Sequence, residues 1–139
     1  MALTSKQVQG DIYRFLSESP LNTLISGDVY RAGVRPRDSG LEDAVVIFTT
    51  GIPGEIEAGV VTINIYVPDI DAWENGVLVE DGERTEEVER LASEWVKSLT
   101  AEHSDYLFRL QQTIYTEADK ELHQHFVVVK LAYRYYGNE

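Results

Sequence analysis

The chain of 139 residues contains no cysteine, and this absence excludes several kinds of site at once. Disulfide bonds, thiolate metal sites and a cysteine nucleophile are all excluded. Basic residues are scarce too: 12 lysines and arginines stand against 24 aspartates and glutamates, for a formal net charge of -12. DNA, RNA and anionic membranes bind clustered positive charge, so we expect neither nucleic acid nor a membrane as a direct partner.

Long apolar runs are absent as well. No run approaches the roughly 20 residues that a membrane-spanning helix requires, and residues 1–20 lack the basic and apolar regions of a signal peptide. We therefore expect a soluble protein made in a cytoplasm. The hydrophobic fraction of 43% is sufficient for a core, and no repeat or linker divides the chain, so residues 1–139 are expected to form a single domain.

The clearest strand in the sequence is Val60–Val67, which reads V-V-T-I-N-I-Y-V. Its apolar residues at alternate positions are Val61, Ile63, Ile65 and Val67, and those between them are Thr62, Asn64 and Tyr66. Such alternation predicts a strand with one buried face and one wetter face. We place this strand in the middle of an antiparallel sheet.

Two segments have apolar stripes at helical spacing. The first begins at a capping box formed by Thr4 and Gln7 and ends before Pro20, which starts a further short helical turn. The second is predicted to begin with Thr85 as its cap and to continue through Leu99.

Other segments predict strands. Ala44–Thr50 is a continuous apolar run, typical of a strand covered on both faces, and turn residues at 51–54 join it to the central strand as a hairpin. Alternation predicts one long strand from Tyr106 to Ile114 and another over Phe126–Tyr136. Glu117–Glu121 is expected to be a charged turn.

This order of elements predicts an α+β two-layer sandwich, in which two α-helices pack on one face of a mainly antiparallel four-to-five-stranded sheet. Val29-Tyr30 is expected to be a short edge strand. The uncovered face and both edges must be solvated or paired with another chain. Side chains expected on that face are Tyr66, Thr62, Asn64, Arg109, Lys130 and Arg134.

Residues 68–82, P-D-I-D-A-W-E-N-G-V-L-V-E-D-G, interrupt the regular pattern as an extended acidic loop, with a turn expected at Asn75-Gly76. Long loops inside compact domains are usually functional. A small domain has little to bury the apolar side chains of this loop, and exposed apolar groups mark interaction sites. The candidate interface residues are Trp73, Val77, Leu78, Val79 and Tyr66. The alternative is that the loop folds back over its own sheet.

A metal site is the alternative chemistry. His123 and His125 are two residues apart in a predicted strand, so both imidazoles would point to one side, and Asp69 and Asp71 could supply oxygen ligands. The spacing of these residues fixes no third ligand. We therefore prefer the interpretation that the two histidines and the two aspartates are solvated on the surface. No nucleophile elbow and no glycine-rich phosphate loop is present. We therefore expect no enzyme activity, no cofactor and no metal, with a metal-binding module or metal-dependent enzyme as the alternative.

Several segments in succession resemble one family. They are L-N-T-L-I-S-G-D-V-Y at residues 21–30, A-V-V-I-F, V-V-T-I-N-I-Y-V, the helix start E-E-V-E-R-L, and H-F-V-V-V-K-L-A-Y-R-Y. Over nearly the whole chain this order is similar to the tail-completion, or tail-terminator, proteins of tailed bacteriophages and prophages. The most specific part comprises Leu21, Leu24, Gly27, Val29 and Tyr30. The acidic segment 68–82 is longer than in many relatives.

The resemblance implies a small α+β subunit of a homo-oligomeric ring, typically a hexamer, at the head-proximal end of the phage tail. Its partners would be tail-tube and head-connector proteins, and it would carry no catalytic residues. It would reside in the bacterial host cytoplasm during assembly and in the virion thereafter. An acidic ring would also let DNA pass through its lumen without binding. An accessory binding domain of bacterial, non-phage origin is a further alternative.

Overall fold

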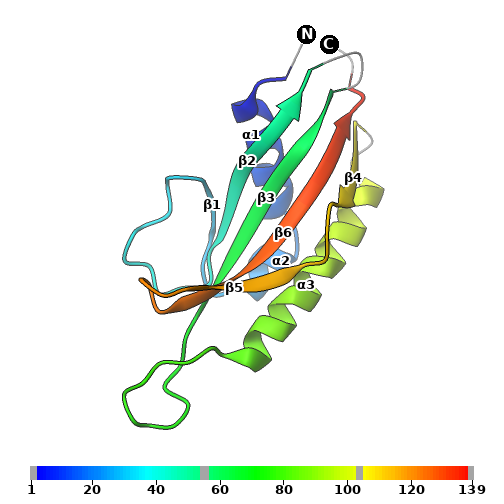
Figure 1. Ribbon diagram of the computed structural model, residues 1–139. Helices are drawn as coiled ribbons and strands as arrows, with labels where there is room; N and C mark the ends of the chain where they lie inside the picture. The colour runs from blue at the N-terminus through cyan, green and yellow to red at the C-terminus, as the bar shows by residue number, and fades with distance from the viewer. Residues whose placement is uncertain (1–2, 54–56, 103–104, 138–139) are drawn as a thin grey trace.

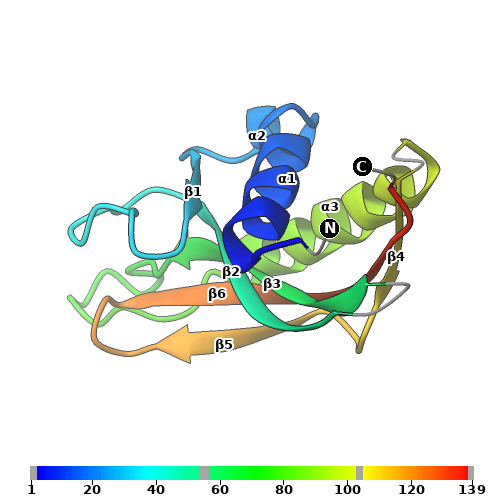
Figure 2. The same ribbon diagram turned by 90° about the horizontal axis from the view of Figure 1, so that it is seen from above.

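The computed structural model describes residues 3–53, 57–102 and 105–137. Within these residues the chain forms an α+β fold of six strands and three helices, with the helices on one side of the sheet (Figures 1 and 2). The helices are α1 (Ser5–Ser17), α2 (Leu21–Leu24) and α3 (Gly82–Glu102). The strands are β1 (Val29–Arg31), β2 (Ala44–Ile52), β3 (Glu57–Pro68), β4 (Tyr106–Leu110), β5 (Tyr115–Asp119) and β6 (Gln124–Tyr135).

β3 is the central strand, as its alternation predicts. The strand order is β1-β2-β3-β6-β4, and β3 pairs antiparallel with both β2 and β6. The side chains of β3 that face the helices are at most 1% exposed: Val61, Ile63, Ile65 and Val67. β4 and β5 pair with different halves of β6, β4 with Leu131–Tyr135 and β5 with Gln124–Val128.

The α+β class is confirmed, but the predicted strand and helix numbers were too low. The sheet is mixed because β1 pairs parallel to β2, with Val29 opposite Ala44. The single strand expected from Tyr106 to Ile114 is broken after Leu110, and the chain resumes pairing as β5. β5 therefore occupies much of the predicted charged turn, Glu117–Glu121. The short turn after Pro20 is the third helix.

The first helix starts as predicted, because the capping box of Thr4 and Gln7 forms in both directions. The start of α3 was predicted four residues too late, with the cap at Thr85 rather than Asp81. The Oδ1 of Asp81 accepts the backbone N–H of Arg84 at 3.3 Å and so caps the helix. Thr85 lies inside the first turn, where its hydroxyl donates to Glu80 Oε2 at 2.7 Å.

β2 is covered on both faces only at its start. Ala44, Val45 and Val46 are buried, whereas the strand is exposed from Thr49 onward. β2 also extends to Ile52, into the predicted 51–54 turn, whose last residue lies outside the described residues. The end of β2, the start of β3 and the end of β6 lie at the end of the sheet opposite the β3–α3 loop (Figure 1).

Candidate functional site

The loop between β3 and α3 projects beyond the end of the sheet (Figure 1). Trp73 is 75% exposed, Val77 57% and Leu78 44%. The loop therefore does not fold back over its own sheet, which was the alternative interpretation. Val79 is half-buried at the base of the loop. Three large apolar side chains in one short projecting segment form an exposed group of the kind found at contact sites.

Backbone and side-chain hydrogen bonds give this loop a defined shape. Ile70 and Val79 exchange two backbone hydrogen bonds of 2.8 Å, which close the loop at its base. The carboxylate of Asp71 accepts the N–H groups of Asn75 at 3.0 Å and Gly76 at 2.9 Å. Gly76 adopts φ 80°, a left-handed conformation that glycine adopts without strain. The predicted turn at Asn75-Gly76 is thus present and fixed by Asp71.

The base of the loop is tied to β6 and to the turn before it. Asp69 Oδ1 lies 2.7 Å from His125 Nδ1, and the Asp69 N–H donates to the carbonyl of His123 at 3.1 Å. The Nε2 of the same His125 ring lies 3.7 Å from Glu80 Oε1. The two hydrogen bonds of Asp69 hold the start of the loop against β6, and the Ile70–Val79 bridge joins this start to the other end of the loop.

The predicted geometry of the two histidines was wrong. His125 is in β6, but His123 is in the preceding turn with φ 53°, so the two side chains do not share a strand face. His125 is instead directed to Asp69. Among the described residues there is no group of three His, Asp or Glu side chains placed to hold a metal ion.

Tyr66 lies on β3 rather than in the loop, and its ring is partly covered. The guanidinium carbon of Arg35 is 3.9 Å from the ring centroid, and the Phe126 ring centroid is 5.4 Å away. Burial raises the pKa of Tyr66. Tyr66 is therefore partly covered, whereas Trp73, Val77 and Leu78 are exposed.

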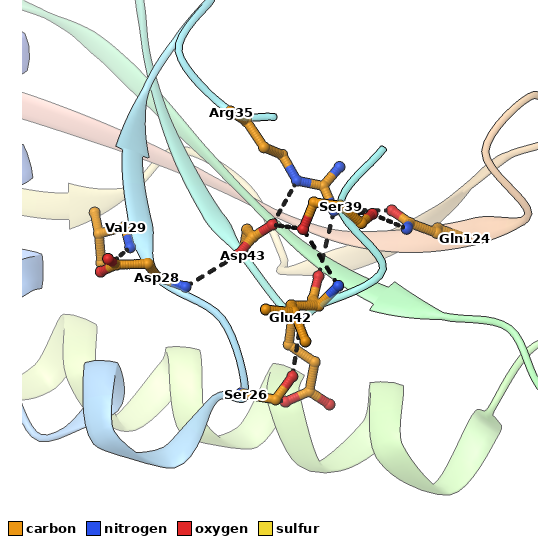
Figure 3. A network of polar contacts seen from close by, with 9 residues as sticks. Ser26, Asp28, Val29, Arg35, Ser39, Glu42, Asp43 and Gln124 are labelled. Carbon is orange, nitrogen blue, oxygen red and sulfur yellow. Dashed lines mark hydrogen bonds and ion pairs between the residues drawn. The ribbon is translucent and has the colours of Figure 1, made fainter. Parts of the chain in front are cut away.

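A buried polar network fixes the 32–43 segment on the sheet (Figure 3). Asp43 is fully buried, and its carboxylate accepts from Arg35 Nε at 2.8 Å, from the hydroxyl of Ser39 and from the Asp28 N–H at 3.0 Å. Arg35 also donates to Gln124 Oε1 at 3.0 Å, which joins the segment to β6. Burial alone would raise the pKa of Asp43, but these hydrogen bonds outweigh it and lower that pKa.

A second part of the network joins the same segment to α3. Arg84 donates to both carboxylate oxygens of Glu42, at 2.6 and 2.7 Å, and to the carbonyl of Leu24 at 2.7 Å. The backbone N–H groups and side chains of Ser26 and Glu42 exchange two hydrogen bonds of 3.0 Å. Burial opposes ionisation of Glu42, yet Arg84 and Ser26 lower its pKa overall. Sequence patterns did not reveal this network, because its members lie on separate segments.

The face of the sheet opposite the helices is open near the start of β3. A concavity of about 480 Å³ lies there between β2, β3, β6 and β4. The sequence placed Arg109 and Arg134 on this face, and both line the concavity, together with apolar side chains that the sequence did not single out. The largest of these, Ile52 and Leu107, are 71% and 52% exposed.

No helix in the described residues is long and apolar enough to cross a membrane. A scan of protein-family models gives no match to the sequence, and a search of curated proteins gives no significant relative.

Proposed function

We propose that this protein is a non-enzymatic structural subunit of a tailed phage or prophage, which forms a homo-oligomeric ring at the head-proximal end of the tail. The proposal combines the sequence resemblance to tail-completion proteins with the exposed loop. The observation that carries it is Trp73, whose side chain is 75% exposed on a loop fixed by Asp69, Asp71 and the Ile70–Val79 bridge. Ordering an exposed tryptophan in advance lowers the entropy lost when a partner covers it.

The resemblance motif has a structural role in this chain. Leu21 and Val29 are each 3% exposed in the core, and a Cβ at Gly27 would lie 2.0 Å from the carboxylate of Asp43. The motif therefore positions the turn into β1 against the buried network. The packing of this chain thus accounts for Leu21, Gly27 and Val29, whereas Leu24 is 49% exposed.

The net charge of -12 fits a ring through which DNA passes. A negatively charged lumen repels phosphate groups, so DNA would move through it without being held. Tail-tube and head-connector proteins would contact the two rims of the ring. During assembly the subunit would be in the host cytoplasm, and afterwards in the virion.

Electron microscopy of the purified protein in negative stain tests this function. Ring-shaped particles with a central opening, six-fold in their class averages, are the expected result. Particles without rotational symmetry at concentrations where the protein self-associates would contradict a ring. A second experiment compares phage lysates from a host with the intact gene and from a host in which the gene is deleted. Loss of the subunit should leave heads and tails unjoined in the second lysate.

A further inference from the structure

The concavity on the open sheet face is basic and apolar in a strongly acidic chain. Among the described residues that line it none is acidic, and its charged members are Arg109 and Arg134. Both arginines are exposed, and neither has an ion-pair partner among the described residues. By contrast, Arg35, Arg84 and Arg90 are each paired with a carboxylate.

The loop 69–81 has the complementary composition. It contains Asp69, Asp71, Glu74, Glu80 and Asp81 and no lysine or arginine. Glu74 is exposed beside Trp73 at the projecting end, while Val77 and Leu78 supply further apolar surface. An acidic apolar loop and a basic apolar concavity match in both charge and polarity.

The two surfaces cannot meet within one copy. Ala58, beside the concavity, is at the start of β3, and the loop begins after Pro68, at the other end of the same strand. A rise of about 3.4 Å per residue separates these positions by roughly 34 Å. Figure 1 shows the loop directed away from the sheet, at the end opposite the last residues of β2 and the first residues of β3.

We propose that the loop 69–81 of one copy docks in the Arg109/Arg134 concavity of the next copy. Trp73, Val77 and Leu78 would cover Ile52 and Leu107, and Glu74 would pair with the two guanidinium groups. The volume of about 480 Å³ is within the roughly 300–1,000 Å³ that binding pockets provide for compact groups. This inference rests on the proposed function and names its subunit contact.

The contact is head-to-tail, because the two surfaces differ and lie at opposite ends of the sheet. Such a heterologous contact repeats from copy to copy and forms a ring when its rotation closes, whereas a contact between identical surfaces stops at a dimer. Two variants, each lacking one surface, therefore complement each other. A copy with an intact loop and a copy with an intact concavity form one contact and then stop.

The test uses two full-length variants. Trp73→Ser/Glu74→Arg removes the aromatic side chain and reverses the charge of the loop. Arg109→Glu/Arg134→Glu reverses the charge of the concavity. Arg37→Glu/Lys120→Glu is the control, since it reverses two exposed charges elsewhere. Circular dichroism and the melting temperature confirm that each variant folds. Masses are then measured by light scattering, for each variant alone and for the mixed pair.

The expected result is that each surface variant alone is a monomer, the mixture forms a dimer of one copy of each, and the control assembles as the wild type does. Assembly of the concavity variant alone, or a mixture that stays monomeric while the wild type assembles, would overturn this contact and leave the proposed function standing. A wild type that never self-associates would count against both.

Discussion

The Nε of Arg35 donates to Oδ2 of Asp43 at 2.8 Å, and the two side chains are only 9% and 1% exposed. This ion pair lies between β1, the 32–43 segment and β6, because Asp43 also accepts from Asp28 and Arg35 also donates to Gln124. The pair therefore fixes the end of the sheet from which the Trp73 loop leaves. Four predictions test the stability and the surfaces of this arrangement.

Asp43→Asn is expected to destabilise the fold strongly. The change leaves Arg35 buried without its counter-charge and weakens the acceptor for the Asp28 N–H. Removing one partner of a buried ion pair costs about 3 kcal/mol or more in free energy of unfolding, which corresponds to a fall of roughly 10 °C in melting temperature. Thermal unfolding measures the change in melting temperature, and urea unfolding measures the change in free energy of unfolding. Glu94→Gln, in the exposed pair with Arg90, is the control, and an equal effect there would contradict the role assigned to burial.

Stability should fall in acid because of Asp43 and Glu42. The pKa values of both carboxyls are lowered in the folded state from 3.8 and 4.5. Below those ordinary values the unfolded chain takes up protons before the folded state does, so the free energy of unfolding decreases as the pH falls. The contribution is complete above about pH 5 and is lost as the pH passes through the lowered pKa values. Urea unfolding of the wild type from pH 7 down to pH 3 should show this decrease in the free energy of unfolding. The Asp43→Asn variant should show a smaller decrease.

Gly27→Ala is expected to destabilise the turn into β1. The added Cβ would lie 2.0 Å from Asp43 Oδ1 and 2.5 Å from the carbonyl oxygen of Glu42, so the network would have to move. Overpacking of this kind costs about 3 kcal/mol. Gly40→Ala is a matched control, because its Cβ meets no atom within 4 Å. If the two alanine variants unfold at the same urea concentration, the close approach at Gly27 has no energetic consequence.

Trp73→Ser/Leu78→Ser should weaken self-association and leave the fold intact. Both side chains are exposed, so the free energy of unfolding should change by no more than about 0.5 kcal/mol. A change in melting temperature of many degrees would mean that the loop belongs to the core. Val34→Ser replaces an apolar residue that is 63% exposed on another loop, and it should not affect association.

The sequence predicted the parts of the fold that depend on local periodicity. The alternation around Ile63 placed the central strand, and Thr4 with Gln7 placed the first helix, because both signals lie within a few residues. The break between β4 and β5 was missed because alternation continues through the residues that leave the edge of the sheet. The start of α3 was misplaced because Asp81 and Thr85 are both good caps, and the hydrogen bond of Thr85 to Glu80 decides between them.

The candidate surfaces were likewise predictable from the sequence only in part. Trp73 and its apolar neighbours stood out because a small domain has little surface left to bury them. The concavity was only partly predictable: alternation placed Arg109 and Arg134 on the open face, but pairing brings them together, since Arg109 is opposite Ala132 and Arg134 is opposite Leu107. His123 was misassigned because a left-handed turn residue cannot be recognised from spacing.

The mass of the wild-type protein over a wide range of concentrations tests the central claim of ring assembly most directly. Light scattering on a size-exclusion column gives this mass. The account predicts a mass that rises with concentration and levels off at a closed ring, six times 15.7 kDa for a hexamer. A mass of 15.7 kDa at every concentration would contradict it.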